Sequence, residues 1–121
     1  LAFGMAQHTD LGRFGEEEAQ AYLRNQGYRL LELNWRFGKE EVDIIALEAN
    51  TLVFVEVKTR TNNTFGLPQE FVSKAKQRHL IKAANAYVER KDLYYEIRFD
   101  IIAVTLQPQK HLEHIKEAFY P

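Results

Sequence analysis

Four charged side chains interrupt two apolar stretches of the segment EEVDIIALEANTLVFVEVKTR, which covers residues 40–60. They are Glu41, Asp43, Glu56 and Lys58. Residues 42–47 and 52–59 are rich in β-branched types and flank the sequence EAN, which predicts two strands joined by a turn. Two acids and a lysine gathered by such a hairpin are able to bind a divalent cation and act on a phosphate ester.

The register of this hairpin decides which charges meet. With a two-residue turn at 49–50, Asp43 faces Glu56 and Glu41 faces Lys58, all on one face. The opposite face then carries Val42, Ile44, Ala46, Val53, Val55 and Val57. Directly opposed side chains have Cβ atoms about 4.5–5.5 Å apart, so two carboxylates there repel unless a proton or a cation lies between them. A shift of one residue would break up the arrangement.

The predicted cluster has two interpretations. Carboxylate oxygens of Asp43 and Glu56 suit Mg²⁺ or Mn²⁺, and the backbone carbonyl of Val57 is a candidate further ligand. Lys58 would then orient the attacking water or stabilise charge in the transition state. Alternatively the cluster is a set of salt bridges, in which Glu41 pairs with Lys58 and Asp43 lies at the margin of the sheet.

The rest of the chain supplies the elements that would position these residues. Apolar spacing predicts amphipathic helices at 9–27 and 69–90. Segments 28–37 and 94–106 are typical of strands, whereas 111–119 fits either a short helix or an edge strand. The resulting order, αβββαβ, predicts an α/β fold with a mixed central sheet flanked by helices.

Length and composition limit the protein to one folded domain. The 121 residues are 45% hydrophobic and 27% charged, as in globular proteins. We expect residues 1–7 to form a flexible segment, with Leu1–Gly4 before Met5 not necessarily native, and 8–121 to form the domain. There is no cysteine, which fits a cytoplasmic protein, and no apolar run is long enough to cross a membrane.

A local patch must supply any affinity for nucleic acid, because the net charge is −1. The predicted second helix carries a basic stripe at intervals of four residues. The basic stripe consists of Lys74, Arg78 and Lys82. Lys76 lies beside it, and Arg60 with the loop predicted at 61–68 follows the hairpin, so these are candidate phosphate contacts. The alternative for the stripe is a solvated helix face.

Two further groups of residues have weaker patterns. Trp35, Arg36 and Phe37 combine aromatic rings with a cation and could contact DNA, although a core position for Trp35 is the alternative. The histidines His8, His79, His111 and His114 show no shared metal spacing. His111 and His114 would suit a metal pair on a helix, and surface positions are the alternative.

Several motifs together resemble a known family. Asp43, followed by Glu56-Val57-Lys58 on the next strand, resembles the PD-(D/E)-x-K signature of restriction-endonuclease-like nucleases. From about His8 onward, nearly the whole chain is similar to the YraN family of small bacterial proteins. The matching stretches are LGRFGEEEAQAYLRNQGYRLLELNWR, EVDIIA, LVFVEVKTR, FGLPQEFVSKAKQRHLIKAANAYV and RFDIIAV.

This resemblance implies a nuclease-like αβββαβ core with Asp43, Glu56 and Lys58 at catalytic positions. Glu41 falls on the acid of the family's G-E-I-D stretch. Glu16 falls on a helix glutamate that helps to bind metal in related junction-resolving enzymes. Its local alternative is a favourable position near the start of a helix.

Two other positions matter for the resemblance. A residue near Gln77 supports the site in related nucleases. The residue before Glu41 is usually glycine in the family, whereas this chain has Glu40, an acid that could hinder the approach of a phosphate backbone.

The sequence thus predicts a nuclease that uses Mg²⁺ or Mn²⁺ to hydrolyse DNA, including branched or other structured DNA. Cutting both strands would need a homodimer or two separate events. The alternative function is a catalytically silent module that binds nucleic acid or a protein partner through the same fold. A purely structural, salt-bridged hairpin is the third possibility.

Overall fold

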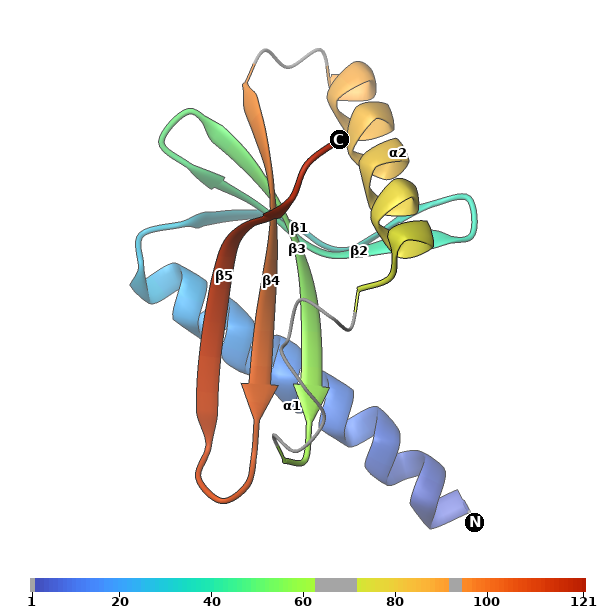
Figure 1. The fold of residues 1–121 in the computed structure, drawn as a ribbon, viewed down its shortest axis with the longest axis vertical. Coiled ribbons are helices and arrows are strands. Elements are labelled where there is room, and N and C mark those ends of the chain that lie inside the picture. Colours follow the sequence, from blue (N-terminus) through green and yellow to red (C-terminus); the bar gives the residue numbers. More distant parts are fainter. Residues whose placement is uncertain (1, 63–71, 92–94) are drawn as a thin grey trace.

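The computed structural model describes residues 2–62, 72–91 and 95–121, with side chains from Asp10 onward. These residues form two helices and five strands (Figure 1). The elements are α1 (Ala2–Asn25), β1 (Arg29–Phe37), β2 (Glu40–Glu48), β3 (Thr51–Arg60), α2 (Lys74–Lys91), β4 (Glu96–Thr105) and β5 (His111–Phe119). Neither helix is long and apolar enough to span a membrane.

One mixed sheet contains all five strands in the order β1-β2-β3-β4-β5. Neighbours are antiparallel except β3 and β4, which are parallel. A parallel pair needs a long crossover, and the connection that includes α2 provides it. The predicted αβββαβ order is confirmed. Segment 111–119 is the edge strand β5 and not a helix, so His111 and His114 do not form a helix-borne pair.

The sheet is covered on both faces, with α1 running across one and α2 lying on the other (Figure 1). Strand β3 shows this burial on both faces most clearly. Leu52 and Phe54 pack on the α2 side, whereas Val53 and Val55 pack on the α1 side. A strand buried on both faces has a continuous apolar run instead of an alternating one, which explains the sequence LVFV.

Helix α1 differs from its prediction at the start and agrees at the end. It begins at Ala2, so residues 2–7 of the expected N-terminal segment belong to the helix. It ends at Asn25, and Gly27 just beyond it has φ +91°, a left-handed value that favours glycine. The Tyr28 N–H donates to the Leu23 carbonyl at 2.9 Å, which closes the last turn.

Helix α2 begins at Lys74, five residues after the predicted start. The Ser73 hydroxyl accepts a hydrogen bond from the Lys76 N–H at 3.1 Å and so caps the helix. Of the predicted helix and loop, residues 63–71 lie outside the described part of the chain.

Gly15 sets how closely α1 approaches the sheet. A Cβ atom at this position would lie 1.7 Å from Thr59 Oγ1 and 2.8 Å from Thr59 Cβ. Both distances are far below van der Waals contact, so a side chain at residue 15 would force α1 away from β3.

We expect Gly15→Ala to lower the free energy of unfolding by about 1–3 kcal/mol, the usual cost of overpacking. Urea titration would measure it. Gly12→Ala is the matched control, since nothing lies within 4 Å of a Cβ there and alanine is the better helix former by about 1 kcal/mol. If both variants were stabilised, the close contact with Thr59 would not exist.

Candidate active site

The hairpin of β2 and β3 has the predicted register near its turn. Its paired residues run from Glu48 and Thr51 to Ile44 and Val55. Beyond these pairs Asp43 is joined to β3 by its side chain, because its Oδ2 accepts a hydrogen bond from the Val57 N–H at 2.8 Å. Val57 therefore enters the site through its N–H group.

The predicted alternation of faces is wrong at Val42. This residue packs with Ile45 on the α2 side, whereas Ile44 packs on the α1 side. On the neighbouring strand Asn34, which lies opposite Asp43, has φ 51°. The ladder between β1 and β2 skips Asn34 and Asp43, and this local distortion interrupts the strict alternation of a regular strand.

Glu56 is the buried member of the site. The residue is only 5% exposed. Its Oε2 lies 3.6 Å from Lys58 Nζ and 3.9 Å from Lys76 Nζ. Its Oε1 is buried and has no hydrogen-bond partner among the described residues. Burial raises the pKa of Glu56, while Lys76 and Lys58 act in the opposite direction.

Asp43 is partly buried beside Glu56, and its pKa is raised to about 7. Burial is the main cause, and the negative charge of Glu56 adds to it. The Val57 N–H and Lys76 lower the pKa, and Glu16 raises it. We call Asp43, Glu56, Lys58 and Lys76 the carboxylate cluster.

This shift makes stability depend on pH. The folded protein binds the Asp43 proton more tightly than the unfolded chain does. The contribution of this proton to stability is therefore complete below about pH 3.8, the pKa in the unfolded chain, and is lost as the pH rises through about 7, the pKa in the folded protein. We expect Asp43→Asn, whose amide oxygen still accepts from Val57, to be more stable than wild type at pH 8. Urea titrations at several pH values would test this, and a wild-type advantage at pH 8 would contradict it.

A second acidic group lies next to the cluster. Asn34 Nδ2 donates to Glu16 Oε1 at 2.9 Å and to Glu41 Oε1 at 3.3 Å. Glu41 also pairs with Arg36 at 3.3 Å, not with Lys58 as the predicted register required. The distortion at Asn34 explains this change.

The two carboxylates of the cluster suit a hard divalent cation. Among the described residues no three His, Asp or Glu side chains are spaced to hold one metal ion, and Glu16 is hydrogen-bonded to Asn34. Mg²⁺ commonly binds through one or two carboxylates and takes its other ligands from water and phosphates. Glu56 Oε1, which has no hydrogen-bond partner in the described part of the chain, is an oxygen ligand of the kind that such an ion prefers, and the residues therefore fit it.

Helix α2 separates its cations into two groups. The basic stripe is exposed, and none of its members has an ion pair or hydrogen bond to another side chain that the structure describes. Lys76 instead points to Glu56, a placement that no motif in the sequence indicated. Gln77 Nε2 donates to the Val72 carbonyl at 3.1 Å and holds the start of the helix.

Two other predicted positions have polar partners. Arg60 Nε donates to Thr105 Oγ1 at 2.9 Å. The carboxylate of Glu40, which replaces the family's usual glycine, lies 3.2 Å from His79 Nδ1. Glu40 is therefore held against α2 by an imidazole.

His114 belongs to a buried network on the α1 side and is not a surface residue. Its side chain is 4% exposed, and its Nε2 lies 2.7 Å from Asp100 Oδ2. Its Nδ1 lies 3.0 Å from the Tyr22 hydroxyl. Asp100 also accepts two hydrogen bonds from Arg98, at 2.9 and 2.8 Å. This arrangement ties α1, β4 and β5 together.

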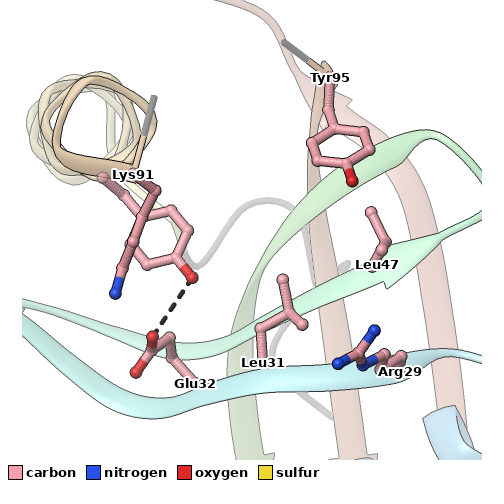
Figure 2. A pocket seen from close by; sticks show the side chains of 7 residues that line it. Arg29, Leu31, Glu32, Leu47, Lys91 and Tyr95 are labelled. Atoms are coloured by element: carbon pink, nitrogen blue, oxygen red, sulfur yellow. Dashed lines mark hydrogen bonds between the residues drawn. The ribbon is translucent and has the colours of Figure 1, made fainter. Parts of the chain in front are cut away.

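A separate pocket of about 330 Å³ lies between the sheet and the end of α2 (Figure 2). Leu31 and Leu47 supply apolar surface, and Lys91 and Tyr95 also line it. The Tyr87 hydroxyl donates to a Glu32 carboxylate oxygen at 3.3 Å. No residue of the carboxylate cluster lines this pocket. The pocket is therefore separate from the candidate active site, which lies at the cluster.

Comparison with known proteins gives a consistent result. A model of the Uncharacterised protein family UPF0102 matches residues 15–104. The chain is 53% identical to a UPF0102 protein of Flavobacterium psychrophilum, over 96% of this chain and 98% of the other. It is 50% identical to one from Christiangramia forsetii, over 96% and 98%, and 46% identical to one from Bacteroides thetaiotaomicron, over 97% and 98%. These matches confirm the resemblance to the YraN family.

Proposed function

This chain belongs to the uncharacterised protein family UPF0102, and from that premise and the carboxylate cluster we propose that it is a metal-dependent nuclease acting on DNA. One observation carries the proposal. The buried Glu56 has an oxygen with no hydrogen-bond partner among the described residues, lies beside a second carboxylate of raised pKa, and has two lysines within 4 Å. Two carboxylates in a folded core repel unless a proton or a cation lies between them, and we assign that place to a metal ion.

Each member of the cluster has a role in this proposal. Asp43 and Glu56 would hold Mg²⁺ or Mn²⁺, which supplies Lewis-acid polarisation of the phosphate and a water of lowered pKa. Asp43 is held in place by the Val57 N–H. Lys58, whose side chain is 37% exposed, is accessible to a substrate and would stabilise developing charge on the phosphate.

The basic stripe would bind the DNA backbone. Lys74 lies at the start of α2, and Ser73 caps that start. The dipole of the helix disfavours cations at this end. A first-turn Lys74 that is unfavourable for the helix, together with Arg78 and Lys82, which are likewise unpaired within the described structure, is consistent with a surface that meets phosphates. Recognition of this kind depends on backbone and shape, which suits branched or other structured DNA.

Binding of Mn²⁺, measured by calorimetry, is the experiment that tests the proposal. We expect wild-type protein to bind Mn²⁺ with micromolar to millimolar affinity at pH 8. The variant Asp43→Asn with Glu56→Gln should lose this binding and remain folded, because both substitutions keep the side-chain shape. A variant that bound Mn²⁺ as tightly as wild type would contradict the assignment. Wild-type cleavage of branched and duplex DNA in Mn²⁺ and in EDTA would then separate an enzyme from a silent binding module.

A further inference from the structure

Lys76 differs from the other cations at the start of α2. Its Nζ lies 3.9 Å from Glu56 Oε2, and its side chain is 34% exposed. Lys74 and Arg78, two residues away on either side, are exposed and have no ion pair with the residues that the structure describes. The helix therefore turns one of its cations toward the carboxylates and leaves its neighbours for solvent.

Lys76 lies beside Glu56 and acts electrostatically on both carboxylates of the cluster. Its charge lowers the pKa of Glu56 and also that of Asp43. Lys58, whose Nζ lies 3.6 Å from Glu56 Oε2, also lowers the pKa of Glu56. An ammonium group that acts on both carboxylates has the position in which a cation would neutralise the pair.

The contact of Lys76 with Glu56 is weak. A separation of 3.9 Å is too long for a hydrogen bond, and Glu56 Oε1 has no partner among the described residues. Lys76 also lies in the first turn of α2, where the helix dipole disfavours a positive charge. A divalent cation carries twice the charge and coordinates carboxylate oxygens directly, so it would compete well for the same place.

We propose that Lys76 is the counter-ion of the carboxylate pair in the metal-free protein, and that a divalent cation displaces it so that it binds a substrate phosphate beside the basic stripe. The inference rests on the proposed function. It makes Lys76 a binding residue that couples two events, the binding of metal and the binding of DNA. Because such coupling is reciprocal, metal should tighten the binding of DNA, and DNA should tighten the binding of metal.

The first test measures metal binding without DNA. Calorimetry with Mn²⁺ at pH 8 would compare wild type, Lys76→Met and Lys74→Met. We expect Lys76→Met to bind Mn²⁺ about tenfold more tightly, the effect of removing one positive charge about 6 Å from a divalent ion at high dielectric. Lys74→Met should match wild type. Lys76→Gln serves as a second variant, and thermal unfolding would show that each protein is folded.

The second test measures the salt dependence of DNA binding by fluorescence anisotropy. In Ca²⁺, Lys76→Met should lower the magnitude of the salt slope by about one, the loss of one phosphate contact. In EDTA it should leave the slope unchanged, because Lys76 then lies on Glu56. Lys74→Met should lower the slope equally in both buffers.

The outcomes separate this inference from the proposed function. Unchanged or weaker Mn²⁺ binding by both Lys76 variants would overturn the inference and leave the nuclease proposal intact. An equal loss of salt slope in Ca²⁺ and EDTA would also overturn it, since Lys76 would then be an ordinary phosphate contact. Failure of the wild-type protein to bind Mn²⁺ at all would overturn both.

Discussion

Lys58→Ala is expected to lower the rate of DNA cleavage by about 10²–10³-fold, the usual effect of removing one group that stabilises transition-state charge. Lys58 Nζ lies 3.6 Å from Glu56 Oε2, so it is held next to the proposed metal position. The affinity for DNA should change far less, because the basic stripe would supply most of the phosphate contacts. Single-turnover cleavage in Mn²⁺ and anisotropy in Ca²⁺ would measure the two quantities.

Two controls make this result interpretable. Lys39→Ala removes an exposed cation in the turn between β1 and β2. It leaves the carboxylate cluster intact, so this variant should cleave DNA like wild type. Urea titration of Lys58→Ala would show whether the loss of the ion pair unfolds the protein. If Lys58→Ala only reduced stability and cleaved at the wild-type rate, Lys58 would have no catalytic role.

Asp100→Ala is expected to lower the free energy of unfolding by about 3–5 kcal/mol, the cost of removing one partner from a buried ion pair, although Arg98 keeps its contact with Glu48 at 2.9 Å. Asp100 is fully buried and accepts hydrogen bonds from Arg98 and from the Glu117 N–H. The Arg98 side chain is only 14% exposed. The variant would leave this guanidinium and the His114 ring with unmet hydrogen bonds.

Urea titration would measure the loss, with Glu113→Ala, an exposed substitution on the same strand as His114, as the control. Burial raises the pKa of Asp100, but hydrogen bonds from His114 and Arg98 outweigh it and the pKa is lowered. The stabilisation from this shift is therefore present above about 3.8 and is lost as pH falls through the lower, folded value. A change below 1 kcal/mol in Asp100→Ala would show that the network contributes little.

The sequence predicts the local part of the site well. The alternation of residues along two adjacent strands predicted that Asp43, Glu56 and Lys58 would lie near one another. The two-residue turn predicted the register of five paired positions of the hairpin. The prediction failed at Val42, because the distortion at Asn34 belongs to the pairing with another strand. A left-handed asparagine has no signal in the alternation of β2 itself.

Contacts between elements far apart in the sequence could not be predicted from the local sequence patterns. Lys76 joins Glu56 only because α2 packs against the sheet, and a lysine in a helical segment gives no sign of which side it will face. His114 is buried because β5 pairs with β4 and brings it to Asp100. Its spacing from His111 suggested a metal pair, with a surface position as the alternative. The buried partner, Asp100, lies on another strand, so the sequence near His114 gave no sign of it.

The parallel pairing of β3 with β4 also has a consequence for the order of folding. Asp43 and Glu56 are brought together by the local β2–β3 hairpin, whereas Lys76 arrives with the crossover that precedes β4. Non-local pairings of this kind tend to form late. A hairpin formed first would hold two repelling carboxylates without Lys76. The charges of the site therefore oppose formation of the hairpin until α2 packs against the sheet. This is a local frustration, which the native contacts then relieve.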